Sequence, residues 1–124
     1  MGAARSFTEL VVWQKAHTFV LAAYRLSSSF PAAERYGLTS QLRRAAVSVP
    51  ANIAEGFRRR SGADKARMLN IAHASMEECC YYLILARDLG YGSDDALTEL
   101  AQEVSKMLGA YERSVRNAVS AKSS

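Results

Sequence analysis

Four stretches of this chain repeat apolar residues every three or four positions, the spacing that places side chains along one side of an α-helix. The first two stripes are Val12, Ala16, Phe19, Ala23, Leu26 and Phe30, then Leu38, Leu42, Ala45, Val49, Ile53 and Phe57. The other two are Leu69, Ala72, Met76, Cys79, Leu83 and Ala86, then Leu97, Leu100, Val104, Leu108, Tyr111 and Val115. No stretch alternates apolar and polar residues as a strand would. The pattern therefore predicts an all-α protein.

Turn and capping residues separate the four stripes. Pro31 and Gly37 interrupt the pattern after the first stripe, and the sequence Gly90-Tyr91-Gly92 ends the third. Ser61 with Asp64 resembles a capping box, Ser6 with Glu9 resembles another, and Ser93 is a third candidate cap. The expected helices run roughly over 7–29, 38–59, 62–89 and 93–119, with a frayed tail over 120–124. Short turns between helices of this length predict an up-down-up-down antiparallel four-helix bundle in a single domain, 1–124.

The first helix has a wider apolar face than one packing seam needs. Beside its main stripe runs a second one, made of Leu10, Trp13, His17, Val20 and Tyr24. Two adjacent stripes on one helix indicate burial against more than the rest of one bundle. We therefore expect the chain to self-associate.

The second helix carries the unusual sequence SVPANIAEGFRRR, from Ser48 to Arg60. Pro50 has no backbone N–H, so the carbonyl of Ala46 loses its partner, and we expect a kink or local unwinding there. The side chain of Ser48 or of Asn52 could satisfy that carbonyl. Gly56 lacks a side chain, which permits another backbone to approach closely or ends the regular helix.

A polar row flanks the apolar stripe of the second helix, and we expect it to face the third helix. If the two helices are antiparallel about the turn at Arg60, residues whose numbers sum to about 122 lie opposite each other. That register pairs Arg44 with Glu78, Ser48 with Ser75, Asn52 with Asn70, and Glu55 with Arg67. The predicted interhelical polar network comprises Gln41, Arg44, Ser48, Asn52, Glu55, Arg67, Ser75 and Glu78. Such a network fixes the register of two helices more than it stabilises them.

Positive charge is concentrated in one part of the chain. The stretch from Arg43 to Arg67 holds seven basic and two acidic residues, a net charge of +5, whereas the whole chain carries +4. Basic side chains at this density can neutralise nucleic-acid phosphates and release counterions. The candidate phosphate-binding residues are Arg58, Arg59, Arg60, Lys65 and Arg67. The alternative is that they form a solvated helix end, where arginine also favours the negative end of the helix dipole.

Several phrases of the sequence resemble one known family. They are LVVW from Leu10, FPAAERYGLTSQLRRAAVSVPANIAEG from Phe30, SMEE from Ser75, and LARDLGY ending at Tyr91. Together they resemble the four-helix-bundle family of the 23S rRNA intervening-sequence (S23) type, over roughly Phe7 to Tyr91. The resemblance implies an up-down bundle that assembles as a homopentamer, and it assigns the polar positions of the phrase to Gln41, Arg44, Ser48, Asn52, Glu55, Ser75 and Glu78. It implies no defined biochemical activity.

Residues for catalysis or metal binding do not form a recognisable pattern. A di-iron bundle needs Glu three residues before a His on each of two helices. Here the residue three before His73 is Asn70, and the residue three before His17 is Gln14. His73 and Glu77 alone are only two ligands. No phosphate-binding loop or nucleophile motif occurs. We expect no catalytic residues, no metal and no cofactor.

The cysteines and hydropathy indicate where the protein acts. Cys79 and Cys80 are sequence neighbours, which can bridge only with strain, so we expect reduced thiols in the cytoplasm. No stretch is long and apolar enough to predict a membrane span.

Two functions remain open from the sequence. The leading one is a non-enzymatic, cyclic homo-oligomer that binds nucleic acid, in particular RNA, through a repeated basic edge. The alternative is a homo-oligomeric scaffold that binds another protein and no nucleic acid. An enzyme is a third and weaker interpretation.

Overall fold

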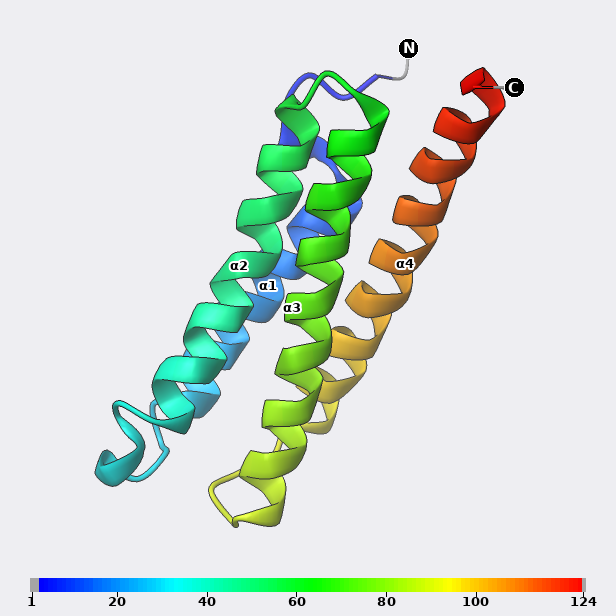
Figure 1. Ribbon diagram of the computed structural model, residues 1–124. Helices are drawn as coiled ribbons and strands as arrows, with labels where there is room; N and C mark the ends of the chain where they lie inside the picture. The colour runs from blue at the N-terminus through cyan, green and yellow to red at the C-terminus, as the bar shows by residue number, and fades with distance from the viewer. Residues whose placement is uncertain (1–2, 124) are drawn as a thin grey trace.

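A computed structural model describes residues 3–123 of the chain, and every regular element among them is helical (Figure 1). The four long helices are α1 (Val11–Ser27), α2 (Leu38–Arg58), α3 (Gly62–Asp88) and α4 (Asp95–Ser123). Two single 3₁₀ turns, η1 (Phe7–Glu9) and η2 (Ala32–Glu34), precede α1 and α2. The predicted all-α class with four helices is confirmed for the described residues.

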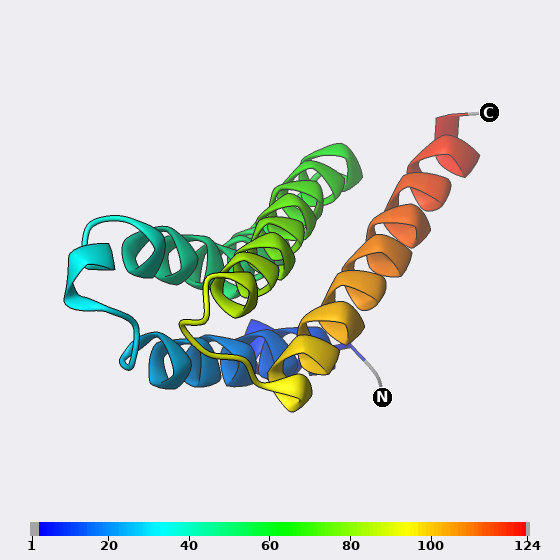
Figure 2. The ribbon, with the colours of Figure 1, turned by 90° about the horizontal axis from the view of Figure 1, so that it is seen from below.

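Successive helices run in opposite directions, so that α1 and α3 descend and α2 and α4 ascend in Figure 1. Helix α2 packs most extensively on α3, and α3 packs next most extensively on α4. The loop that contains η2 joins α1 to α2 at the lower end of the bundle, whereas the turn between α2 and α3 lies at the upper end (Figures 1 and 2). The arginine-rich stretch is therefore at the opposite end of the molecule from the η2 loop.

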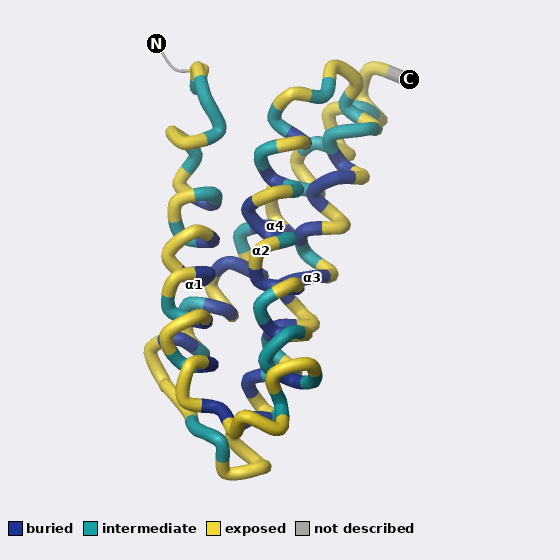
Figure 3. The backbone as a smooth tube through the Cα atoms, turned by 90° about the vertical axis from the view of Figure 1, so that its left-hand side faces the viewer, coloured by how far each residue is buried: buried dark blue, intermediate teal, exposed yellow. Residues whose placement is uncertain are grey.

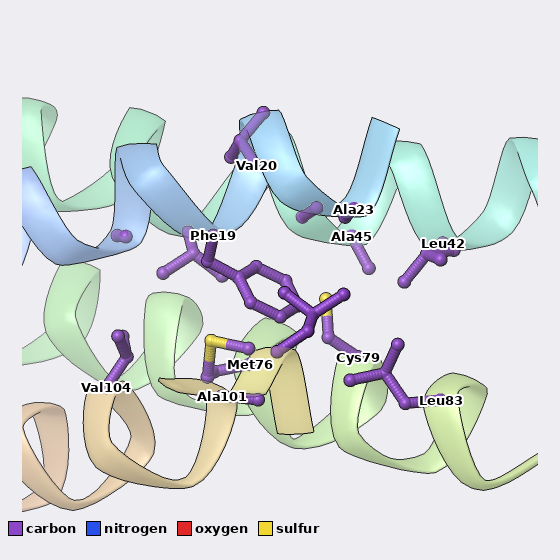
Figure 4. Packing of buried hydrophobic residues seen from close by; sticks show 14 of the residues in the cluster. Phe19, Val20, Ala23, Leu42, Ala45, Met76, Cys79, Leu83, Ala101 and Val104 are labelled. Carbon is purple, nitrogen blue, oxygen red and sulfur yellow. The ribbon is translucent and has the colours of Figure 1, made fainter. Parts of the chain in front are cut away.

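The predicted stripes of α2 and α3 form the centre of the core. All six stripe residues of α3 are buried, and the five from Leu38 to Ile53 on α2 are buried as well. Figure 3 shows buried positions on the sides of the helices that face one another. Phe19 of α1 lies among Met76 and Cys79 of α3 and Ala101 of α4 in Figure 4, and its side chain is fully buried.

The second stripe of α1 is only partly covered by the other helices. Val20 is buried and Trp13 is half-buried, but His17 and Tyr24 are exposed. The Trp13 and His17 rings stack with their centroids 5.2 Å apart. Helix α4 is also partly uncovered, since none of its described residues after Gly109 is buried. The rest of this chain thus leaves apolar side chains of α1, among them Val11 and Leu21, uncovered.

Helix ends differ from the predicted bounds for local reasons. Helix α1 begins at Val11 because Leu10 is extended, and Ser6 caps the preceding 3₁₀ turn by accepting from the N–H of Thr8 at 3.2 Å. The predicted Ser93 cap is wrong, because Asp94 accepts from the N–H of Leu97 at 3.1 Å. The predicted frayed tail is also wrong for 120–123, since α4 continues to Ser123; position 124 lies outside the described residues.

The glycine turn after α3 has the geometry that the sequence predicts. Gly90 has a φ of +77°, and its N–H bonds to the carbonyl of Arg87 at 3.0 Å. The N–H of Tyr91 bonds to the carbonyl of Ala86 at 2.9 Å. This pair of bonds is a Schellman motif, which uses a left-handed glycine to end a helix.

Both cysteines are free, with Cys79 buried and Cys80 half-buried. Burial, followed by the charges of Cys80 and Glu78, raises the pKa of the Cys79 thiol well above its ordinary value. Cys79 is therefore a packing residue, as its place in the α3 stripe predicts. No helix among the described residues has the length and hydropathy of a membrane span.

Candidate nucleic-acid interface

The turn between α2 and α3 brings the arginine-rich stretch to one end of the bundle. Helix α2 ends at Arg58, Arg59 is extended, and Ser61 caps α3 by accepting from the N–H of Asp64 at 3.0 Å. Gly56 lets the two helices approach closely, because a Cβ there would lie 3.1 Å from the Cβ of Met68. This explains the glycine in the SVPANIAEGFRRR phrase: it makes room for α3 rather than ending α2 early.

Lys65 has a structural partner that the sequence analysis did not identify. Its Nζ atom donates to the carbonyls of Gly56 and Phe57, at 3.3 and 3.1 Å. Both carbonyls belong to the last turn of α2, where carbonyls lack i+4 donors; that of Gly56 also accepts from the N–H of Arg59 at 3.2 Å. The ammonium group also lies 5.9 Å from the centroid of the Phe57 ring. Lys65 thus caps α2 from α3, and its assignment as a phosphate contact is not supported.

Two of the five candidate phosphate ligands form ion pairs within their own helices. Arg59 pairs with Glu55 at 3.0 Å, and Arg67 lies 3.8 Å from Asp64. The predicted pairing of Glu55 with Arg67 is therefore wrong. Arg59 lies four residues after Glu55 on the same side of α2, so it reaches the carboxylate without spanning two helices. The Nε atom of Arg59 is buried and has no partner.

Arg58 and Arg60 are the free cations of this end. Both side chains are exposed, and neither forms an ion pair or hydrogen bond with any described residue. Arg67 is also exposed, and its ion pair with Asp64 is long and solvated. We call Arg58, Arg60 and Arg67 the arginine edge. It contains three of the five residues that the sequence analysis predicted to bind phosphate.

The predicted network between α2 and α3 forms around Ser48. Its hydroxyl shares a 2.9 Å hydrogen bond with the hydroxyl of Ser75, as the antiparallel register predicts. Asn52 donates to the Ser48 hydroxyl at 2.9 Å and to the Ser48 carbonyl at 2.8 Å. The expectation that Ser48 or Asn52 would bond to the carbonyl of Ala46 is wrong. Helix α2 also continues through Pro50 without unwinding.

The rest of the predicted network does not form as expected. Arg44 and Glu78 line the same hollow of about 430 Å³ but form no ion pair. Tyr82 lies beside Glu78 instead, and its hydroxyl donates to Gln41 at 3.1 Å and approaches Glu78 at 3.5 Å. Burial, and then the charge of Glu78, raises the pKa of Tyr82. Asn52 bonds to Ser48, and no hydrogen bond joins it to Asn70 within residues 3–123.

A second basic surface lies in a groove between α1 and α2, which sequence reasoning missed. Arg43 stacks over the ring of Tyr24, with its Cζ atom 4.6 Å from the centroid, and its Nε donates to Ser27 at 2.8 Å. Arg44 lies beside it with no partner among the described residues. The doublet Arg43-Arg44 was visible in the sequence, but the contact with α1 depends on the path of the η2 loop.

A polar cluster between α3 and α4 was also missed. Ser105 donates to the carboxylate of Glu77 at 2.6 Å and lies 3.1 Å from Nε2 of His73. Because its only hydrogen points to Glu77, Ser105 accepts from His73, which therefore carries its proton on Nε2. Ser105 is 8% exposed, and the cluster satisfies its buried hydroxyl. No group of three or more His, Cys, Asp and Glu residues in 3–123 is arranged to hold a metal ion.

Comparison with known families agrees with this geometry. The sequence model of the 23S rRNA-intervening sequence protein family matches residues 8–110. The chain belongs to this family. The resemblance carried by the α2 phrase is thereby confirmed, and the match extends into α4, beyond the end at Tyr91 that the sequence phrases indicated.

One solved structure shows how this fold recurs in the family. It is a protein of unknown function from the S23 ribosomal protein family of Bacteroides thetaiotaomicron VPI-5482, with a TM-score of 0.74 and 25% sequence identity. The match covers 82% of this chain and 98% of that one. No curated protein matches the chain. Family membership thus assigns no activity to this protein.

Proposed function

We propose that this protein is a non-enzymatic, self-associating bundle that binds RNA through phosphate contacts at the arginine edge. The observation that carries the proposal is that Arg58 and Arg60 are exposed and form no ion pair or side-chain hydrogen bond at the end of the α2–α3 hairpin. Arginine at the end of a helix often has a carboxylate partner, as Arg59 does here. Two exposed guanidinium groups without such partners suit phosphate oxygens, which accept from them readily.

Self-association would place several copies of this site in one assembly. Val11 and Leu21 of α1 are 55% and 47% exposed, and Tyr81 and Ile84 of α3 are 56% and 45% exposed. We propose that further copies of the chain cover these residues in a cyclic homo-oligomer, with five subunits as the family resemblance implies. A ring repeats the arginine edge around its axis, so one RNA can contact several copies at high effective concentration. We place this assembly in the cytoplasm, where the free thiols stay reduced.

The alternative function is a ring that binds another protein and no nucleic acid. The same exposed apolar residues favour it, since they are suited to any protein surface. The two functions differ in their response to salt. Phosphate contacts weaken steeply as salt rises because counterions compete for the nucleic acid, whereas apolar docking does not.

The test is the binding of a fluorescein-labelled RNA by anisotropy, from low to physiological salt, with light scattering to check assembly. The variant is Arg58→Gln/Arg60→Gln, and the matched control is Lys106→Gln/Arg113→Gln, which removes two exposed charges from α4. We expect the first variant alone to bind more weakly. Absence of binding by the wild-type protein at low salt, with assembly intact, would overturn the proposal in favour of the protein scaffold.

A further inference from the structure

The groove between α1 and α2 combines aromatic rings with guanidinium groups. It has a volume of about 650 Å³ and includes Tyr24, Tyr36, Arg35, Arg43 and Arg44 in its lining. None of its lining residues is acidic. Tyr36, in the loop that joins the two helices at the left of Figure 2, is 86% exposed, the highest value among the exposed large apolar and aromatic side chains of the described residues.

Each tyrosine of the groove has an arginine over its ring. The Cζ atom of Arg43 lies 4.6 Å from the centroid of Tyr24, and that of Arg35 lies 5.5 Å from the centroid of Tyr36. Arg43 is fixed further by its hydrogen bonds to Ser27 and to the carbonyl of Tyr24, at 2.8 and 3.2 Å. The groove therefore has one rigid stack on α1 and one open stack at its mouth, where a second flat group can replace or join the arginine.

Charge decides the kind of partner that suits this surface. Arg44 forms no ion pair with any described carboxylate, although Glu78 lines the adjoining hollow. Cationic groups without counter-ions, next to exposed aromatic rings, are the combination with which proteins hold single-stranded nucleic acid. The phosphates need the cations, and any unpaired base can stack on a ring.

Arg44 of the groove and Arg58 of the arginine edge lie on one side of α2. Fourteen positions separate Arg44 from Arg58, which corresponds to about 21 Å along the helix and a rotation that differs by about 40°. A strand that contacts Arg44 can thus continue along α2 to Arg58 without crossing to another face. The exposed residues Val47, Ala51 and Glu55 lie between them, and the carboxylate of Glu55 is paired with Arg59.

We propose that this groove binds an unpaired nucleotide of a single-stranded RNA, with its base on Tyr36 and its phosphate on Arg44. The inference deepens the proposed function and rests on it, because the same RNA would reach the arginine edge. It adds two properties that phosphate contacts alone do not supply. Single strands bind more tightly than duplexes, and part of the affinity is independent of salt.

The probes that test it are a fluorescein-labelled 12-nucleotide oligouridylate and an RNA duplex of the same length. Tyr36→Ala should weaken binding of the single strand about 5- to 150-fold, the usual effect of losing one base stack, without changing its salt dependence. Arg44→Gln should reduce the slope of log affinity against log salt by about 0.7. Neither variant should alter binding of the duplex. Both residues are exposed, so the fold should tolerate either change.

The possible outcomes separate the two proposals. If single strand and duplex bind equally and neither variant changes the affinity, the groove proposal is overturned while RNA binding at the arginine edge stands. If the wild-type protein binds neither probe, both proposals fail. If Tyr36→Ala or Arg44→Gln instead dissociates the oligomer in light scattering, the groove is an interface between copies of the chain, and the groove proposal is overturned.

Discussion

Lys65→Met tests the division of the basic stretch into structural and binding residues. Methionine keeps most of the apolar stem of lysine but removes the ammonium group that caps α2. Each of the two lost hydrogen bonds contributes about 0.5–1.5 kcal/mol. The lost positive charge at the helix terminus contributes about 0.3–1 kcal/mol more. Lys65 is only half-buried, so water replaces part of both contributions. We expect the free energy of unfolding to fall by about 1–2 kcal/mol.

The assay is urea unfolding followed by circular dichroism, at one fixed protein concentration because self-association couples stability to concentration. With a slope of about 1–3 kcal/mol per molar urea, the midpoint should fall by about 0.3–2 M. The matched control is Arg60→Met, which removes an exposed charge that has no partner among residues 3–123. It should change the free energy of unfolding by less than about 0.5 kcal/mol. RNA affinity should respond in the opposite order, with the larger loss in Arg60→Met. An unchanged midpoint in Lys65→Met, combined with the larger loss of RNA binding, would refute the capping role.

Three further predictions concern the bundle itself. Phe19→Ala removes a fully buried ring and should destabilise the protein by about 3–5 kcal/mol in the same urea assay. Ser48→Ala leaves the buried hydroxyl of Ser75 without its interhelical partner, so it should lower the free energy of unfolding by about 1–3 kcal/mol. A Ser48→Ala/Ser75→Ala double variant whose loss of stability exceeds the sum of the two single losses would contradict this. The hydrogen bond from Tyr91 to Glu34 raises the pKa of Tyr91, which means that its contribution is present below about pH 10 and is lost as pH rises through the folded pKa. The stability difference between wild type and Tyr91→Phe should therefore shrink between pH 8 and pH 11, and a difference that stays constant would show that this bond does not stabilise the fold.

The sequence predicted the centre of the bundle because local periodicity and one tight turn determine it. Three residues join α2 to α3, so a guess at their register was enough to place Ser48 opposite Ser75. The same register failed for Glu55 and Arg67, since Arg59 offers the carboxylate a partner within its own helix. Register arguments identify which residues face each other but not which of several cations a carboxylate selects.

Contacts that depend on the longer connections were not predictable in this way. The stack of Arg43 on Tyr24 requires the path of residues 28–37, and the bond from Ser105 to Glu77 requires the register of α3 against α4. The role of Lys65 depends on where α3 begins relative to the last carbonyls of α2. In each case residue type was visible in the sequence, but the partner was set by tertiary packing.

The salt dependence of RNA affinity tests the central claim most directly. Each arginine that contacts a phosphate of a single strand contributes about 0.7 to the slope of log affinity against log salt. Arg58→Gln/Arg60→Gln should therefore reduce the slope by about 1.4, while Lys106→Gln/Arg113→Gln should leave it unchanged. Equal slopes for wild type and both variants would contradict phosphate binding at the arginine edge.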